Sequence, residues 1–488
     1  MAVLLQKNIK LFFKNLLKNY FGDKNFIGAS LFLALVFPNI NIIATDWLIT
    51  NSGNYKLGYD ILSSGDTNGT IRIRSSYVTL DMNYLFLKQT TSTASCNGIV
   101  IDPGVTNLII KNGTISGFTL NGISVGSNCN KININNVVIE NCTASGAAGA
   151  GITVASGCSN VSVDSILISN CASSGIIFNT VVDSVVSNFK MTTIGATSSS
   201  YGLSLSSCNR IQVFNGSISN SSVTNDFLGF RIINSNNSFF KDLFVARCTN
   251  VVTLICFYLA QASGCKLINC NTIDCSSVGL RGIEINTVSN CQFDQCSMFN
   301  NNTSQAYGFF IANSSGNVIN QFRVIGNSAS SFQAILFFNN GTSYNNIFTE
   351  CIISKNSTSG IFYGITDELS NKYNTFLNCI VSNNTSSGNL AVGLYGQNAA
   401  FSSWVVQDCL FEYNNGNTDA NSYGISVPSN NNSVFTRNVA FANGPTNPLI
   451  GNQLFGVPLT SLTTPGRGGA GSPSTRISSA MSPWGNLR

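Results

Sequence analysis

Apolar and polar residues alternate in short segments that recur along the chain. A polar residue such as Asn136 has an apolar residue two positions earlier, Ile134, and another three positions later, Ile139. The same arrangement returns every 23 to 30 residues. The polar positions, here called anchors, are Asn112, Asn136, Ser165, Asn188, Asn215, Asp242, Cys270, Gln295, Gln321, Glu350, Asn378, Asp408 and Asn438. Alternation with a period of two predicts short strands, each with one buried face.

A glycine followed by an apolar–any–apolar triplet precedes most anchors by about 14 residues, as at Gly122 and Gly282. Gly, Asn and Ser fill the gaps between segments, which is the composition of turns. One such repeat cannot bury its own apolar face, whereas stacked repeats form a continuous core. The sequence therefore predicts an all-β parallel β-helix, a solenoid of about 13 coils with three short strands per coil.

Stacking has a consequence for the anchors. Successive coils lie about 4.8 Å apart, so equivalent side chains form columns along the rod. We expect the anchors to form one column of half-buried polar side chains that hydrogen-bond to one another.

Residues 122–142 and the segment 70–83 carry a family resemblance. Both resemble right-handed parallel β-helix proteins of the pectate-lyase-like superfamily, over roughly residues 55–443. The resemblance implies the fold and leaves the activity open, because the superfamily includes lyases, hydrolases, epimerases, phage tailspikes and adhesins.

The N-terminal segment differs from the repeats. A basic stretch precedes an uncharged apolar run at 26–37, which is typical of a secretory signal. Residues 1–44 are predicted to be a signal peptide cleaved after Ala44, or an uncleaved signal anchor. We expect membrane contact only through this segment, and a protein that is secreted or held at the cell surface.

Three further regions complete the predicted organisation. Residues 45–69 are expected to form an N-terminal cap, with Trp47 and Tyr55 over the first coil. The parallel β-helix follows over 70–443. Residues 444–488 hold six of the nine prolines in Gly/Ser-rich sequence and are predicted to be a disordered tail.

Composition restricts the chemistry. The chain contains no histidine, so imidazole catalysis and histidine metal ligation are excluded. Only 9% of the residues are charged, and the net charge of +5 comes from the two ends. A rod with little net charge and no basic stripe argues against nucleic-acid binding.

The sixteen cysteines recur at equivalent positions of the repeats. One interpretation is a ladder of small, buried, free thiols. The alternative is disulfides between coils, such as Cys142–Cys171, because the spacing of adjacent coils lies within the range that a disulfide can span.

Candidate catalytic residues are few. Arg231 and Glu284 occupy outward positions of the glycine-led strand, two coils apart, and Arg281 approaches the same patch. They are interpreted either as a weak catalytic centre or as two ordinary surface charges. Asp367 and Glu368 are adjacent and are expected to form a solvated turn. No metal or cofactor site is predicted, and calcium enters only under the lyase alternative, since calcium requires several oxygen ligands.

Two functions remain open. The first is an exported, non-enzymatic β-helix protein that is structural at a surface or binds a glycan or host surface. Its Asn, Ser and Thr faces, with Phe310, Tyr395 and Trp404, suit sugar contacts. The alternative is a polysaccharide lyase or glycoside hydrolase acting on an extracellular polysaccharide.

Overall fold

The computed structural model describes the central part of the chain. The described residues are 42–43, 47–63, 69–90, 95–143, 149–195, 200–223, 225–338, 343–368, 371–388, 390–396, 403–416, 422–426, 434–441 and 443. The predicted signal segment, apart from residues 42–43, and the predicted tail 444–488 lie outside them. Among the described residues there is no helix of the length and apolar character that a membrane span requires.

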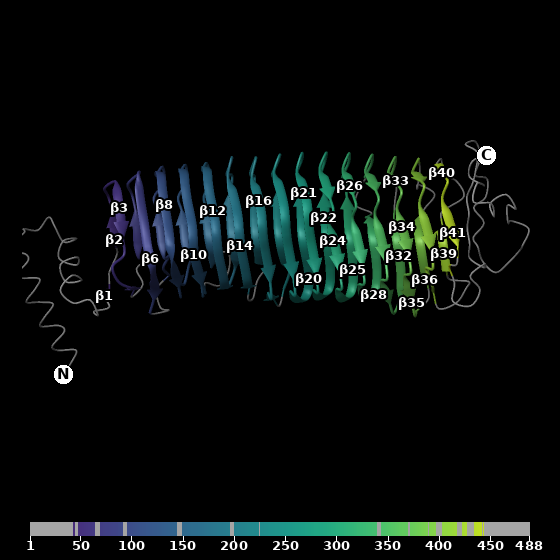
Figure 1. Ribbon diagram of the computed structural model, residues 1–488, viewed down its shortest axis with the longest axis horizontal. Coiled ribbons are helices and arrows are strands. Elements are labelled where there is room, and N and C mark those ends of the chain that lie inside the picture. The colour runs from purple at the N-terminus through teal and green to yellow at the C-terminus, as the bar shows by residue number, and fades with distance from the viewer. Residues whose placement is uncertain are drawn as a thin grey trace, which may run out of the picture.

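The described chain is a rod of stacked turns, with N- and C-terminal turns at opposite ends (Figure 1). It is a parallel β-helix of about 13 turns, as predicted. The strands pair in parallel and fall into two sheets. Most turns in the N-terminal half hold two strands, one in each sheet. Turns toward the C-terminus hold three or more, as in β23 (Gln292–Asp294), β24 (Ser297–Phe299) and β25 (Asn302–Ala312).

The first sheet contributes one or two strands to each turn. Its other strands are β1 (Ile42–Ile43), β3 (Gly53–Lys56), β4 (Ile61–Ser63), β6 (Val78–Gln89), β8 (Thr106–Ser116), β10 (Asn130–Glu140), β12 (Ser159–Cys171), β14 (Val185–Ile194), β16 (Gln212–Ser219), β19 (Phe239–Ala246), β21 (Lys266–Ile273), β26 (Val318–Asn320), β27 (Arg323–Ile325), β29 (Ile347–Thr349), β30 (Ile352–Ser354), β33 (Thr375–Leu377), β34 (Ile380–Ser382), β37 (Val405–Gln407), β38 (Leu410–Glu412), β40 (Val434–Thr436) and β41 (Val439–Phe441).

The second sheet carries the glycine-led strands. Its other strands are β2 (Trp47–Ile49), β5 (Ile71–Ile73), β7 (Ile99–Ile101), β9 (Ile123–Val125), β11 (Ala150–Val154), β13 (Ser174–Asn179), β15 (Ser200–Ser206), β17 (Ser222–Val223), β18 (Phe227–Ile233), β20 (Thr249–Ala260), β22 (Ser276–Asn286), β28 (Ser328–Phe337), β31 (Ser357–Thr358), β32 (Ile361–Asp367), β35 (Thr385–Ser386), β36 (Leu390–Gly396) and β39 (Ser422–Ser426).

Within the expected cap, parallel pairing already begins before residue 70. Strand β2 pairs with β5, β3 with β6, and β4 with β6. Trp47 and Tyr55 lie edge to face, with ring centroids 6.1 Å apart, and both pack against the end of the core.

The anchors form a corner of the first sheet at which the backbone is left-handed. Their φ values lie between 50° and 59°, a region that Asn and Asp tolerate better than most residues. Two predicted anchors are wrong by one residue. Strand pairing places Asn269 opposite Gln295, and Arg437 opposite Asp408, so Cys270 and Asn438 follow the corner.

Turn-to-turn hydrogen bonds do run along the corner, although it lies at the surface. The Asn136 side chain donates to Asn112 Oδ1 at 2.8 Å in an exposed position. The anchor column was expected to be half-buried, whereas a further column, which was not predicted, is fully buried and lies six residues after each corner, at the C-terminal end of the rod. Its members are Asn301, Asn327, Asn356, Asn384, Asn414 and Asn443, joined by Nδ2–Oδ1 bonds of 2.8–3.1 Å.

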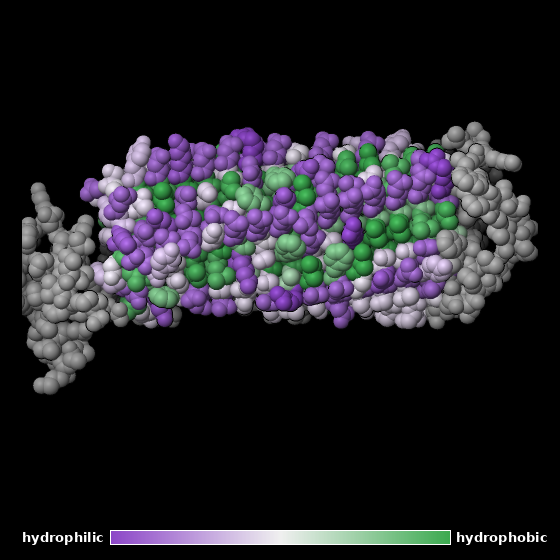
Figure 2. All heavy atoms as spheres, in the orientation of Figure 1, coloured by the Kyte–Doolittle hydropathy of each residue, from purple (hydrophilic) through white to green (hydrophobic). Residues whose placement is uncertain are grey.

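The sixteen cysteines are all buried and free. Some continue the asparagine column toward the N-terminus: the Cys275 N–H donates to Asn301 Oδ1 at 2.8 Å. The structure thus agrees with the free-thiol interpretation. Like side chains form rows along the rod surface as well, where hydrophilic and hydrophobic stripes alternate (Figure 2).

The repeated glycine has a steric cause. A Cβ at Gly308 would lie 2.4 Å from the Ala334 carbonyl oxygen of the next turn. The glycine therefore permits close approach of two turns beside the outward-facing residues of the second sheet, where the candidate site lies.

Candidate functional site

Two rows of outward-facing side chains run along the second sheet. Strand pairing defines the first row as Ser204, Arg231, Tyr258, Glu284, Phe310, Leu336, Thr366, Tyr395 and Ser426. The second row, three residues earlier, is Tyr201, Leu228, Ile255, Arg281, Tyr307, Gln333, Tyr363, Val392 and Tyr423. We call the two rows together the tyrosine face, because they contain six half-buried tyrosines.

Arg281 and Glu284 meet on this face. Their side chains form an ion pair, with Arg281 Nη1 2.6 Å from Glu284 Oε2. Glu284 is only 6% exposed. Burial raises the pKa of Glu284, and the charge and hydrogen bond of Arg281 offset that effect only in part. The interpretation of Glu284 as an ordinary surface charge is therefore wrong, because the aromatic neighbours and Arg281 cover its carboxylate.

Aromatic rings also pack against the Arg281 guanidinium. Its centre lies 4.3 Å from the Phe310 ring centroid and 5.8 Å from that of Tyr307. Phe310 also packs against Phe338, with centroids 4.9 Å apart. Phe310 is 5% exposed, so it supports Arg281 and offers little surface to a sugar.

Arg231 lies two turns away from Glu284, as predicted, and does not contact it. Its guanidinium lies over the ring of Tyr201, 4.8 Å from the centroid. Nη1 donates a hydrogen bond to Ser204 Oγ at 3.1 Å. Stacking on an aromatic ring fixes the plane of a guanidinium and leaves its edge open to acceptors.

Tyr258 fills the turn between Arg231 and Glu284. Burial and the Glu284 charge raise the pKa of Tyr258, while Arg231 and Arg281 oppose this, so the phenol stays protonated as a hydrogen-bond donor. The glycine-led pattern missed Tyr258 because Cys256 replaces glycine in that turn. The triplet from Phe257 to Leu259 would have revealed it.

A second aromatic group lies toward the C-terminus of the face. Tyr363 and Tyr395 stack with centroids 4.6 Å apart and an interplanar angle of 11°. The sequence predicted a role for Tyr395 in sugar contact, and its half-exposed ring is compatible with that role. Trp404 is different: it is completely buried and donates Nε1–H to the Asn371 carbonyl at 3.0 Å, so the expected sugar contact by Trp404 is wrong.

Asp367 and Glu368 do not form the predicted solvated turn. Asp367 is 2% exposed and accepts a hydrogen bond from Asn371 Nδ2, because the strand alternation turns it toward the core, in register with Phe337. Glu368 is half-buried beside Gln333, and burial raises the pKa of Glu368 while a hydrogen bond from Gln333 opposes this.

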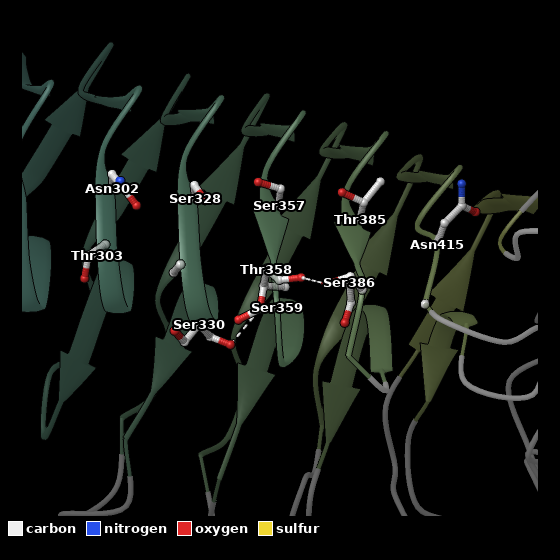
Figure 3. Close-up of a pocket in the computed structure, with 13 residues that line it drawn as sticks. Asn302, Thr303, Ser328, Ser330, Ser357, Thr358, Ser359, Thr385, Ser386 and Asn415 are labelled. Carbon is white, nitrogen blue, oxygen red and sulfur yellow. Dashed lines mark hydrogen bonds between the residues drawn. The ribbon is translucent and has the colours of Figure 1, made fainter.

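A shallow groove of about 650 Å³ runs across the other end of the same strands. Figure 3 shows its side chains on successive turns. They are Asn302, Thr303, Ser328, Ala329, Ser330, Ser357, Thr358, Ser359, Thr385, Ser386, Ser387, Asn415 and Gly416. Two floor hydroxyls already donate to backbone carbonyls, Thr358 to Ser330 at 2.8 Å and Ser386 to Gly360. The groove holds no ionisable or aromatic residue, so the tyrosine face offers the richer chemistry.

In the described part of the chain, no three His, Cys, Asp or Glu side chains cluster around a common point. The charged residues of the tyrosine face can instead bind and orient a polar ligand.

Comparison with known proteins supports the fold. Residues 253–388 match the family described as "Right handed beta helix region". No curated protein matches the chain.

Several solved structures are similar to the chain. The Dettilon tailspike protein is 10% identical, with a TM-score of 0.38 over 64% of this chain and 58% of its own. A mutant of the periplasmic alginate epimerase AlgG is 13% identical, with a TM-score of 0.38 over 70% and 78%. A mutant tailspike of E. coli bacteriophage HK620, in complex with a pentasaccharide, is 14% identical, with a TM-score of 0.38 over 79% and 72%.

Proposed function

The chain is a right-handed parallel β-helix protein, and we propose that it is an exported, non-enzymatic rod that binds a glycan along its tyrosine face. The observation that carries the proposal is the series of six half-buried tyrosines on one face, accompanied by two arginines. Flat rings that are held by their neighbours give contact area at a low cost in side-chain entropy. The apolar run at 26–37 supports export.

The geometry suits an extended ligand. Each turn advances the face by about 4.8 Å, which is comparable with the length of one pyranose unit, so successive sugars can meet successive turns. Tyr363 and Tyr395 present a stacked pair to sugar C–H groups. Arg231, Gln333 and Glu368 are half-buried and supply polar groups beside the rings.

The second candidate is a polysaccharide lyase or glycoside hydrolase. The observation that favours it is the raised pKa of Glu284, since a general acid must hold its proton near the working pH. An inverting glycosidase needs two carboxyl groups about 6.5–9.5 Å apart. Glu368 directly follows β32, which lies three turns from the strand that holds Glu284. The two carboxyl groups are therefore separated by about 14 Å along the rod. Glu284 also forms an ion pair with Arg281, which lowers the pKa of Glu284 and so opposes its role as a general acid.

Glycan binding by the full-length chain tests the proposal. We expect Tyr363→Ala to weaken binding about two- to tenfold, since one aromatic contact contributes about 0.5–1.5 kcal/mol. Tyr344→Ala is the matched control, because Tyr344 is 47% exposed and lies off the tyrosine face.

The same glycans should be followed for new reducing ends and unsaturated products. Binding without turnover supports the proposal. If turnover is observed and Glu284→Gln abolishes it, the polysaccharide lyase or glycoside hydrolase replaces the non-enzymatic proposal. Equal losses in Tyr363→Ala and Tyr344→Ala, or no binding to any glycan, would refute the tyrosine face as the site.

A further inference from the structure

The two arginines of the tyrosine face are in different electrostatic states. Arg281 is neutralised by the buried carboxylate of Glu284 at 2.6 Å. Arg231 forms no ion pair among the described residues, and one of its N–H groups is used on Ser204 Oγ. A guanidinium has five N–H donors, so most of those of Arg231 are available to a ligand.

Arg231 is also pre-organised for an anion. The Tyr201 ring lies 4.8 Å from its centre, and Ser204 fixes one nitrogen, so the planar fork is held before a ligand arrives. Apolar Leu228 and Ile255 lie beside it in the second row, which lowers the local polarisability and strengthens a charge-assisted bond. Tyr258 adds a protonated phenol on the next turn.

We propose that the glycan bound by this face carries an oxyanion, a carboxylate or a sulfate, and that Arg231 with Tyr258 forms its seat. This inference rests on the proposed function, because it names the chemical class of the ligand for the same face. The guanidinium donates in parallel to two oxygens of the anion, the geometry in which arginine exceeds lysine.

In this arrangement Glu284 forms an ion pair with Arg281. Arg231 is then the one arginine of the tyrosine face that can bind an anion of the ligand. Glu368 directly follows β32, five turns from the strand of Arg231 and about 24 Å away along the rod. Its negative charge repels a second acidic group of the ligand at that position. The fitting ligand therefore carries acidic groups at wide spacing, with a neutral portion over Tyr363 and Tyr395. A densely charged polyanion fits poorly.

Binding of two matched oligosaccharides to the full-length chain tests this assignment. The first contains one acidic sugar, and the second is identical except that the carboxyl group of that sugar has been reduced. We expect the acidic form to bind more tightly, and Arg231→Gln to lower its affinity on the order of tenfold to a hundredfold. The reduced form should bind the variant as it binds the wild type. Arg231→Lys, which keeps the charge and loses the fork, should fall between them.

Two further variants sharpen the test. Arg210→Gln is the matched control, because Arg210 is already paired with Asp183 at 2.5 Å and lies on the first sheet's side of the turn. Glu284→Gln should strengthen binding of a doubly acidic oligosaccharide, because it releases Arg281. Unchanged or weaker binding would contradict the neutralised state assigned to Arg281. Thermal unfolding confirms that each variant is folded.

The outcomes separate the two proposals. Equal binding of both oligosaccharides, unaffected by Arg231→Gln, would overturn the anion seat and leave glycan binding standing. Equal loss in Arg231→Gln and Arg210→Gln would show attraction by overall charge and would also overturn the seat. Binding of neither oligosaccharide would overturn the proposed function together with this inference.

Discussion

The buried asparagine column predicts a large and local stability effect at Asn327. The Asn301 N–H and side-chain Nδ2 both donate to Asn327 Oδ1, at 3.0 and 2.8 Å. Asn327 Nδ2 donates in turn to Asn356 Oδ1 at 2.9 Å and to the Met298 carbonyl at 3.1 Å. Asn301 and Asn327 are 1% and 0% exposed, so water cannot replace these partners.

Replacing Asn327 by Ala leaves the Asn301 N–H without its acceptor and removes the donor to the Met298 carbonyl, whereas Asn301 Nδ2 keeps the Thr272 carbonyl at 3.5 Å. Two buried groups therefore lose a partner. Each buried polar group that loses its partner costs about 1–3 kcal/mol, so we expect the free energy of unfolding to fall by about 2–6 kcal/mol. This is a large fraction of the roughly 5–15 kcal/mol that stabilises most domains. The cavity left by the missing carboxamide adds to the loss.

Asn302→Ala is the matched control. Asn302 begins β25, directly after Asn301; its side chain is exposed, and surface substitutions usually change stability by less than about 0.5 kcal/mol. Urea unfolding followed by circular dichroism compares the two variants, and hydrogen exchange reports on the Asn301 amide. A free energy of unfolding for Asn327→Ala within about 0.5 kcal/mol of the Asn302→Ala value would refute the reasoning.

Two other predictions concern the buried carboxylate and the thiols. Burial raises the pKa of Glu284 in the folded protein, so the folded protein binds the carboxyl proton more tightly than the unfolded chain does. The contribution of Glu284 to the free energy of unfolding is therefore fully present below the unfolded pKa near 4.5. It is lost as the pH rises through the folded-state pKa. Glu284→Gln should therefore flatten the fall in stability above about pH 4.5, measured by thermal unfolding across pH, and an unchanged profile would contradict the burial effect. Titration of denatured, unreduced protein should find all sixteen cysteines reactive. In the folded protein Cys270 should react slowly, because burial and then Cys296 raise the pKa of Cys270 well above its usual value. Fewer reactive thiols after denaturation would indicate disulfides.

Sequence periodicity determined the architecture of this protein. The alternation around Asn136 specifies which side chains face the core, because a strand exposes every second residue. The glycine-led triplets aligned the turns well enough to place Arg231 two turns from Glu284, and the paired strands confirm that spacing through Tyr258. A stacked solenoid makes such inferences strong because each repeat contacts its neighbours in the same way.

The corner shows where periodicity is insufficient. Cys270 and Asn269 both fit the repeat to within one residue, and apolar residues lie near the required positions in either register. Only the hydrogen-bonded pairing selected Asn269, whose left-handed φ of 52° suits an asparagine. The shift also turns Thr272 inward, in register with Met298, which a purely apolar pattern does not predict.

The chemistry of the tyrosine face depended on the tertiary structure for a different reason. An outward position can be exposed or covered, and that depends on side chains from neighbouring turns that are 26 or 27 residues away. Glu284 is buried because Arg281 and Phe310 close over it, whereas Arg231 remains available because its neighbours are Tyr201 and Ser204. The sequence by itself thus determined the rod, its columns and the spacing of its charges. Burial and partner choice, which set the electrostatic state of each charge, were decided only when the turns were stacked.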